Sequence, residues 1–476
     1  MRLHILFYVT LLLYTAPLCA QDLGTITKEK RIQLHGSIGI GSAYYATNSG
    51  LNRQQPLSWY LSGNPTVTLF GIACPFSMTV SDQQRNFSQP FNQYGVSPYY
   101  KWLTLHAGYR SVSFSEFTLA GANFLGGGIE INPKKFRFGF VIGQFRRAVE
   151  EDTSYQFAVL PSYRRTGYAM KIGIGSAANY VDFIYFKGKD DTTSLSTKPK
   201  NALVLPGDNV ALGLKTGWRI GKHIALDGDI GASLLTRDLQ AASFDIDATN
   251  PLYKYYDLAK KFISPNISTR YFLGGRGGIT YFNRTFKLAL NYRYVQPNYE
   301  SFGAYYFQQD IQQITVAPAF ILLKGKLNFG GSYGIQNDNL LKIKAFKTTR
   351  NIGSLNLTYN PSRQFGFTLN YSNFGTSQES GRIQLNDSVR ISFVNQTYGG
   401  NVRFTKTSPT RTSLVMLMGN VMGLTDRNEF TQRLAQVNTF VGVLNYSLTF
   451  NKSGTGLKCK WGRQRRLVPS NILKRL

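Results

Sequence analysis

Residues 286–295 read FKLALNYRYV, and this stretch decides the fold class. Apolar side chains alternate in it with polar, charged or small ones: Phe286, Leu288, Leu290, Tyr292 and Tyr294 against Lys287, Ala289, Asn291 and Arg293. Successive side chains of a β-strand point to opposite faces, so the pattern predicts a strand with one apolar and one polar face. Residues 136–143, FRFGFVIG, repeat it. Such a period along a whole chain is typical of a sheet between lipid and water.

Short turns alternate with long polar loops along the chain, and Gly, Pro and Asn mark the turns. The predicted turns are 62–65, 132–134, 176–179, 220–222, 283–284, 324–325, 360–362 and 407–410, and the predicted loops are 83–98, 187–208, 236–269, 337–350, 375–387 and 424–437. This asymmetry is expected of an outer-membrane barrel. We therefore predict an all-β fold, a single transmembrane antiparallel β-barrel of about 18 strands, within a range of about 16 to 20.

The first twenty residues predict an N-terminal signal peptide. Arg2 and His4 precede an apolar centre at 5–14, and Leu18-Cys19-Ala20 ends the leader before Gln21. The apolar centre is too short to cross a bilayer, although an uncleaved anchor is the alternative interpretation. The predicted organisation is a signal peptide at 1–20, a short N-terminal segment at 21–30, a transmembrane barrel at 31–451 and a basic C-terminal tail at 452–476.

After the leader, the longest apolar runs are short pieces such as 319–323 and 414–418. A membrane helix needs about 20 apolar residues, so a helical membrane protein is not expected. In hydrocarbon every backbone polar group must be paired internally, and a closed barrel is then the remaining way to span a membrane.

The chain is strongly basic, with 54 Lys and Arg against 25 Asp and Glu and a net charge of +29. Such an excess suggests anionic partners. Export argues against nucleic acid, so we expect outer-membrane lipids, lipopolysaccharide and small anionic solutes as partners, and no nucleic acid. Cys74 and Cys459 remain after the leader; Cys74 is interpreted as a small apolar filler, and a disulfide between the two is the alternative.

The polar parity of the strands predicts a basic lumen. The basic residues assigned to it are Arg31, Arg110, Arg137, Arg147, Lys171, Lys215, Arg219, Lys287, Arg293, Lys326 and Arg403, and the acidic ones are Glu130, Asp182, Asp227 and Asp229. A pore lined by Arg and Lys favours anions. Alternatively, these charges pair with one another and with loop carboxylates to stiffen a filled or gated lumen, because buried charges are normally paired.

The segment 110–124, RSVSFSEFTLAGANF, breaks the regular alternation of turns and loops. Two interpretations stay open, namely a pair of strands that the pattern does not resolve and a loop folded into the lumen. The tail 452–476 carries eight basic residues and no acid, and it follows Phe450, an aromatic suited to end a last strand. It is interpreted either as a disordered extension or as a periplasmic arm on anionic lipid or cell wall.

Catalytic and metal-binding patterns are lacking in the sequence. His35, His106 and His223 are the histidines after the leader, and neither H-E-x-x-H nor G-x-S-x-G occurs. We therefore expect no enzyme activity, no cofactor and no metal site. Tyr and Phe near the strand ends are expected to form aromatic girdles at the membrane interfaces, with a sugar-binding slide as the alternative.

The rhythm of strands and turns, the strand LNLTYN at 355–360 and the segment QYGVSPYYKW at 93–102 carry a resemblance. The chain resembles porin-like outer-membrane β-barrel proteins of the Bacteroidota type over nearly all of its mature length. The resemblance implies a location in the cell outer membrane and transfers no functional residue. The expected function is a passive or gated pore with a preference for anions. The alternative is a non-transporting barrel that serves as a scaffold, an adhesin or an accessory to a secretion or surface-assembly system.

Overall fold

The structure is a computed structural model of the 476-residue chain. It describes residues 32–44, 57–82, 92–151, 160–199, 203–243, 246–247, 249–251, 253–304, 308–383, 390–431, 437–450 and 458–465. The predicted signal peptide, the segment 21–30 and Arg31 lie outside these ranges, as does most of the basic tail.

Antiparallel strands make up nearly all of the described chain, which confirms the predicted all-β fold class. The first half contains β1 Ile32–His35, β2 Ile38–Tyr44, β3 Leu57–Gly63, β4 Thr66–Leu69, β5 Ile72–Ser81, β6 Gln93–Val96, β7 Tyr99–Tyr100, β8 Leu103–Ser111, β9 Leu119–Ala120, β10 Asn123–Ile131, β11 Phe136–Arg146, β12 Arg164–Gly175, β13 Tyr180–Asp191, β14 Asp208–Ile220 and β15 Ile224–Thr236.

The second half continues the same sheet. It contains α2 Tyr253–Lys260, β16 Thr269–Phe282, β17 Phe286–Val295, β18 Gly303–Ala304, β19 Ile311–Leu322, η2 Leu323–Gly325, β20 Leu327–Asn337, β21 Phe346–Tyr359, β22 Phe365–Ser380, β23 Ser392–Thr407, β24 Arg411–Asp426, β25 Val437–Phe450 and β26 Lys458–Arg465. Strand β26 lies within the predicted basic tail and pairs with β25, so this part of the tail extends the sheet.

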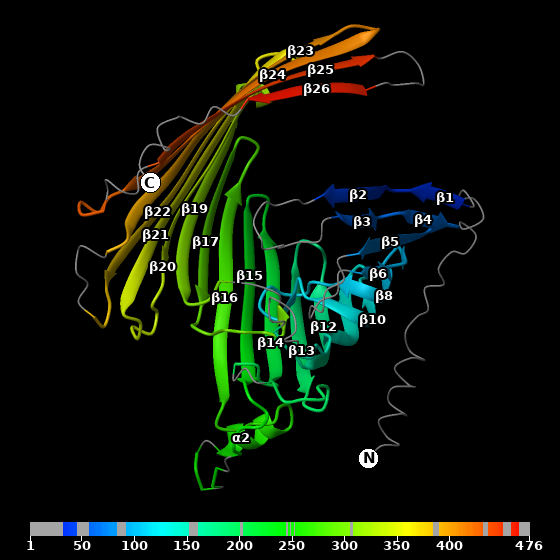
Figure 1. Ribbon diagram of the computed structural model, residues 1–476, viewed down its shortest axis with the longest axis vertical. Helices are drawn as coiled ribbons and strands as arrows, with labels where there is room; N and C mark the ends of the chain where they lie inside the picture. Colours follow the sequence, from blue (N-terminus) through cyan, green and yellow to red (C-terminus); the bar gives the residue numbers. More distant parts are fainter. Residues whose placement is uncertain are drawn as a thin grey trace.

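Three of the strands are interrupted. β1 and β2 pair with β4 and β3, β3 and β4 share β5 as their other partner, and β6 and β7 both lie between β5 and β8. If each interrupted strand is counted once, the described sheet has 20 strands through β25, at the upper end of the predicted range, and β26 adds one more. Figure 1 shows this sheet as a strongly twisted and curved surface, with β1 to β5 and β23 to β26 at its two ends.

The two ends of the sheet are not joined by a ladder among the described residues. β1 and β2 pair with β4 and β3, and β26 pairs with β25. The remaining strands from β8 to β25 pair with their neighbours in chain order, apart from the short strands β9 and β18, which form a separate parallel pair. The described sheet is therefore an ordered succession of hairpins whose first and last edges carry no described partner.

Turns and loops alternate, but one predicted turn is wrong and strands extend into predicted loops, since β6 lies within 83–98 and β21 begins within 337–350. Short turns follow β10, β12, β14, β16, β19, β21 and β23, and the long loops lie at the opposite strand ends. The predicted turn at 62–65 is wrong, because Asn64 and Pro65 only separate β3 from β4 and the Asn64 N–H donates to Ser37 O at 3.0 Å. Pro65 lacks an N–H and so interrupts a strand without reversing it. The chain reverses instead at Phe70 and Gly71, with φ of 50° and 83°.

One face of the sheet, here called the apolar face, carries exposed hydrophobic side chains. Cross-strand neighbours on this face form an apolar row: Trp218, Leu226, Ile279, Leu290, Val316 and Tyr333. Ile279 is 53% exposed and Leu290 48% exposed. The opposite parity, with Lys287, Asn291 and Arg293 in β17, defines the polar face, as the sequence pattern predicts.

The described helix content is small. α2 spans eight residues in the long loop between β15 and β16 and lies at one tip of the molecule in Figure 1. Among the residues that the structure describes, no helix is long and apolar enough to cross a bilayer. Cys74 in β5 is a half-buried free thiol.

Candidate functional site

The candidate site lies where residues 112–122, here called the infolded loop, pack onto the polar face. This segment connects β8 with β10, and Phe117 and Leu119 are completely buried in it. The sheet leaves room for it, because a Cβ on Gly231 would lie 2.3 Å from Phe117 Cβ and a Cβ on Gly139 would lie 2.7 Å from the Phe114 ring. The open question over 110–124 is thereby answered, since the segment is a loop folded over the sheet and not a pair of strands.

Buried hydrogen bonds fix the infolded loop to the polar face. Asp229 of β15 is 1% exposed and accepts hydrogen bonds from Ser115 Oγ at 2.5 Å and from the Glu116 N–H at 3.0 Å. Lys215 Nζ donates to Phe114 O at 3.3 Å. A buried carboxylate that accepts several hydrogen bonds is stabilised in place, and it costs free energy if the bonds are lost. Asp229 is therefore the main anchor of the loop.

A second loop segment, residues 296–304, lies beside the infolded loop on the same face of the sheet. Tyr299 donates its hydroxyl hydrogen bond to Phe117 O at 2.8 Å, and Ser301 Oγ donates to Thr118 O at 2.6 Å. β9 and β18, one from each loop, pair in parallel. The two loops thus form one packed layer on the polar face.

Charged and polar side chains on neighbouring strands lie in register across the polar face. The row runs from β11 to β21 with one glycine in it: Arg137, Gly173, Asp182, Lys215, Asp229, Arg276, Arg293, Gln313, Gln336 and Arg350. Directly opposed residues of antiparallel strands have Cβ atoms about 4.5–5.5 Å apart, so this polar row is nearly continuous. Five of its members were assigned to the lumen from sequence: Arg137, Asp182, Lys215, Asp229 and Arg293.

Glu116 of the infolded loop is the acid at the centre of the site. Its carboxylate pairs with Arg276 at 3.1 Å and with Arg293 at 2.5 Å. These two arginines oppose each other on β16 and β17, where like charges repel. Glu116 offsets that repulsion while remaining 31% exposed, and the Arg276 side chain is 44% exposed. The paired charges are therefore accessible to solvent.

Two further ion pairs belong to the polar face, one at the β11 end of the polar row and one next to the row. Arg137 makes a bidentate pair with Asp182 at 2.7 and 2.9 Å, and its guanidinium stacks on the Tyr180 ring. Glu130 of β10 pairs with Lys171 at 3.3 Å, and Lys171 Nζ lies 4.8 Å from the centre of the Phe114 ring. The ion pair between Glu130 and Lys171 therefore lies against Phe114 of the infolded loop.

His106 lies between Ser97 and Glu130. Its Nδ1 is 2.8 Å from Ser97 Oγ, and its Nε2 is 3.1 Å from Glu130 Oε1. In serine hydrolases the ring presents Nε2 to the serine and Nδ1 to the acid, so this order is reversed. Glu130 is also engaged by Lys171. We therefore interpret the hydrogen-bonded series of Ser97, His106 and Glu130 as a structural connection.

The other residues assigned to the lumen lie apart from this centre. Arg110 of β8 donates to Ser77 Oγ at 2.7 Å and to Pro75 O at 2.9 Å, both on β5. Further along the sheet, the remaining strand residues on the polar parity are Arg219, Asp227, Lys287 and Arg403, of which Arg403 donates to Asn360 Oδ1 at 3.1 Å.

Two of the assigned bases lie outside strands. Arg147 follows the end of β11, and Lys326 follows the short helix η2 in an exposed turn. The period-two pattern did not apply to either, because each residue lies just beyond the end of its strand.

Sequence reasoning missed Glu116, Arg276 and Arg350. Glu116 belongs to a loop, which has no periodic signal. Arg276 lies among glycines in LGGRGGI, where small residues hide the alternation, and Arg350 fell inside a loop predicted at 337–350. No group of three metal-ligating side chains capable of holding an ion occurs in the described ranges.

No protein-family model matches the sequence, and no curated protein matches it. Among solved structures the chain is similar to three Pseudomonas aeruginosa proteins, which are outer-membrane porins. OpdQ is 10% identical with a TM-score of 0.39, over 78% of this chain and 96% of that one. OccK8 (OprE) is 11% identical with a TM-score of 0.36, over 72% and 93%. OccK5 (OpdH) is 9% identical with a TM-score of 0.36, over 78% and 96%. Likeness at this level establishes neither the fold nor the function of this chain.

Proposed function

We propose that this chain is a β-barrel of the cell outer membrane that acts as a passive or gated pore, with the polar face as its lumen wall. The observation that carries the proposal is the contrast between the two faces of one sheet. The apolar row is exposed on one face, and the polar row lies in register on the other. An exposed apolar surface of this extent marks contact with lipid or with a partner, and period-two alternation favours lipid.

Closure of the sheet into a barrel is part of the proposal. Each unpaired backbone group costs several kcal/mol in hydrocarbon, so open sheet edges are not found facing lipid. The first and last strands described here each have an edge without a described partner. We infer that the edges of the first and last strands pair with each other when the protein enters the bilayer.

A preference for anions follows from the charges at the site. The polar row contributes Arg137, Lys215, Arg276, Arg293 and Arg350 as bases. Its acids are Asp182 and Asp229, to which the infolded loop adds Glu116. The excess of positive charge supports attraction of small anionic solutes, as rings of Arg or Lys do in anion-selective pores. Outer-membrane lipids and lipopolysaccharide are the expected partners of the apolar face.

A filled barrel without transport, serving as a scaffold, an adhesin or an accessory to secretion or surface assembly, is the second candidate. The complete burial of Phe117 and Leu119 against the sheet favours it, because this layer occupies space on the polar face. The same layer in a wider lumen would narrow the pore and act as a gate. The two candidates differ in whether ions cross the folded protein.

Conductance in planar lipid bilayers separates the candidates. We expect discrete open levels from the refolded protein, with a reversal potential in a salt gradient that favours anions. Replacing Lys287 and Arg350 by Gln is expected to shift this potential toward cations, because neither side chain pairs with a described carboxylate. The matched control replaces Lys254 and Lys261 in and after α2, which are exposed in a long loop. Correctly folded protein without conductance would contradict the pore and support the filled barrel.

A further inference from the structure

A cavity of about 480 Å³ lies at the loop end of β19 to β22, away from the infolded loop. We call it the rim pocket. Its lining includes Gln312, Asn337, Lys342, Lys347, Ser380 and Gly381. Because two lysines and three amide side chains, the third being Asn339, line it, the pocket offers hydrogen-bond donors to an anionic ligand.

Three strand residues of the rim pocket, Gln312, Asn337 and Lys347, lie on the apolar parity of the sheet. Gln312 pairs with Asn337, two residues beyond the pair Ile314 and Ile335, and these four therefore share one face. Ile314 is 50% exposed and Ile335 43% exposed. Two residues advance a strand by about 7 Å, so the polar pocket lies one row above the hydrophobic surface.

The lysines of the pocket are available for a ligand. Lys347 pairs with Glu379 at 3.2 Å, and both side chains are about half exposed, so this ion pair contributes little. Lys342 is exposed and forms no ion pair with a described carboxylate. The one acid in the lining, Asp338, accepts a hydrogen bond from the Thr348 N–H at 2.6 Å. With Glu379 beside Lys347, the two lysines and the two carboxylates balance in formal charge, so Lys342 is the lysine whose charge is not offset by a described ion pair.

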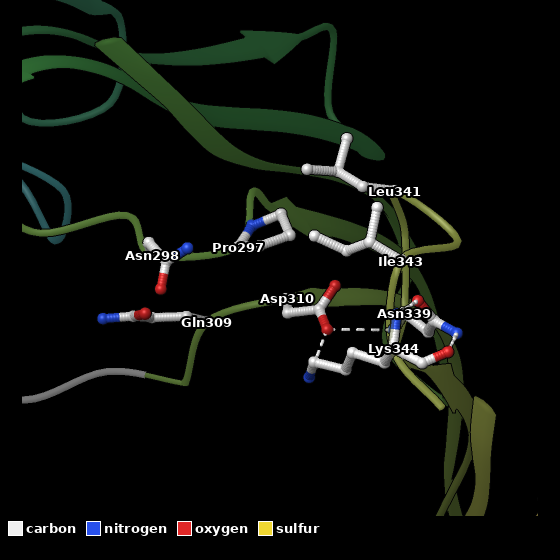
Figure 2. Close-up of a pocket in the computed structure, with 8 residues that line it drawn as sticks. All are labelled: Pro297, Asn298, Gln309, Asp310, Asn339, Leu341, Ile343 and Lys344. Atoms are coloured by element: carbon white, nitrogen blue, oxygen red, sulfur yellow. Dashed lines mark hydrogen bonds and ion pairs between the residues drawn. The ribbon is translucent and has the colours of Figure 1, made fainter. Parts of the chain in front are cut away.

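The wall of the pocket formed by residues 338–345 is held in place by Asp310. This carboxylate is 4% exposed and accepts hydrogen bonds from the N–H groups of Asn339 at 3.0 Å and Leu340 at 2.9 Å. It also forms an ion pair with Lys344. Figure 2 shows the contacts of Asp310 with Asn339 and Lys344 beside a smaller cavity of about 200 Å³ that shares Asn339 with the rim pocket. The loop is thus fixed before any ligand arrives, which lowers the entropic cost of binding.

We propose that the rim pocket binds the phosphorylated headgroup of an outer-leaflet lipid. Lys342 and Lys347 would meet the phosphate oxygens, and Asn337 and Gln312 would meet neighbouring hydroxyl or amide groups. The acyl chains would then lie along Ile314 and Ile335, where burial of their CH₂ groups is favourable. This assignment rests on the membrane placement proposed above. A free phosphate ion shares the headgroup chemistry but gains nothing from the apolar row below.

Lipid retention measured by native mass spectrometry tests the proposal. The protein is folded in a neutral detergent and mixed with a bis-phosphorylated lipid A, the same lipid without phosphates, or inorganic phosphate. We expect the phosphorylated lipid to be retained, and the variant K342Q/K347Q to retain it about tenfold less, since two charge-assisted contacts are lost. The matched control K254Q/K261Q removes the same charge and one equally exposed ion pair, from Lys261 to Asp257, and should retain the lipid like the parent.

A second variant keeps both charges and changes the shape. A Cβ on Gly381 would lie 2.6 Å from Lys344 O and 2.7 Å from Ala345 O, so Gly381→Val must displace the wall of the pocket. We expect this variant to lose lipid retention as well. Equal retention by K342Q/K347Q, or equal binding of the dephosphorylated lipid, would overturn the proposal. Binding of inorganic phosphate alone would overturn the lipid assignment.

The membrane placement is checked separately in the same samples. Protein that conducts in bilayers but retains no phosphorylated lipid would refute the rim pocket and leave the pore intact. Protein that stays soluble without detergent would refute the membrane placement itself.

Discussion

Two sectors of the same sheet carry different side chains on the polar face. From β11 to β17 the face carries charges and lies under the infolded loop, with Asp229 buried and Glu116 clamped between two arginines. From β21 to β23 the middle of the same face carries small neutral groups, with Arg350 and Arg403 toward its two ends. Its residues include Ser354, Asn356, Asn370 and Ser372, all of them exposed. We call these the charged sector and the amide sector.

The polar side chains of the two sectors make different kinds of contact. In the charged sector, ion pairs and buried hydrogen bonds fix a loop at one place on the wall. In the amide sector, contacts such as the one between Asn356 Nδ2 and Asn370 Oδ1 connect strands and hold no loop. A solute that passes along the polar face would therefore meet charge on one side and neutral amides on the other. Stability and selectivity should respond to mutations in the charged sector much more than in the amide sector.

The largest effect is expected at the anchor of the infolded loop. Asp229→Ala leaves the buried Ser115 hydroxyl and the Glu116 N–H without their acceptor, which should lower the free energy of unfolding by about 2–4 kcal/mol. Urea unfolding in detergent, followed by tryptophan fluorescence, measures it. The matched control is Asp227→Ala, two residues away and exposed, which should change it by under about 0.5 kcal/mol. Equal effects of the two variants would mean that the loop is not anchored there.

A glycine of the charged sector and one on β20, next to the amide sector, give the next comparison. Gly231→Ala places a Cβ against Phe117 and the Tyr299 hydroxyl, so overpacking should cost about 1–3 kcal/mol. Gly330→Ala, on the polar face of β20, finds no atom within 4 Å and should be neutral within about 0.5 kcal/mol. The same unfolding measurement applies. A neutral Gly231→Ala would show that the infolded loop does not rest on the sheet in solution.

Ion selectivity should also depend on the sector. Glu116→Gln removes the carboxylate between Arg276 and Arg293, and we expect the anion-to-cation permeability ratio to rise about two- to threefold. Asn370→Asp adds a charge in the amide sector and serves as a position control, with a smaller and opposite shift. Reversal potentials in a salt gradient give both values. An unchanged ratio in Glu116→Gln would remove the charged sector from the ion path.

The smallest effect concerns acid sensitivity of the loop 338–345. Burial raises the pKa of Asp310, but hydrogen bonds from Lys344 and from the N–H groups of Leu340 and Asn339 outweigh it, and the pKa lies below its ordinary value. The bonds therefore stabilise the loop above the ordinary aspartate pKa and are lost as pH falls through the lowered value. Amide hydrogen exchange of 338–345, corrected for intrinsic rates, should show that loss. Asp310→Asn should exchange faster at neutral pH, and equal protection in both proteins would contradict this role.

Much of the fold could be predicted because its signals are local. Alternation in β17 assigned Arg293 to the polar face, and turn residues located most hairpins, since side-chain period and turn chemistry depend on neighbouring residues. The turn at 62–65 was predicted wrongly because Pro65 interrupts a strand without ending it. Sequence identified the infolded loop only as an irregularity, since its place depends on contacts such as that between Tyr299 and Phe117, 182 residues apart.

About half of the charged site could be predicted from sequence, for the same reason. Five residues of the polar row follow from parity within their own strands. Glu116 has no parity to read, and its pairing with Arg276 and Arg293 exists only once the loop has folded across β16 and β17. The local sequence pattern could therefore not predict the role of Glu116.

The central claim is that the two faces of this sheet meet lipid and water in a membrane, and cysteine accessibility on β17 tests it most directly. In a background with Cys74 and Cys459 replaced by Ser, single cysteines at positions 288 and 290 are compared with cysteines at 287 and 291 in protein reconstituted into vesicles. The account predicts that a charged maleimide labels 287 and 291, while a lipid-soluble probe reaches 288 and 290. Equal labelling of all four positions by the charged reagent would contradict it.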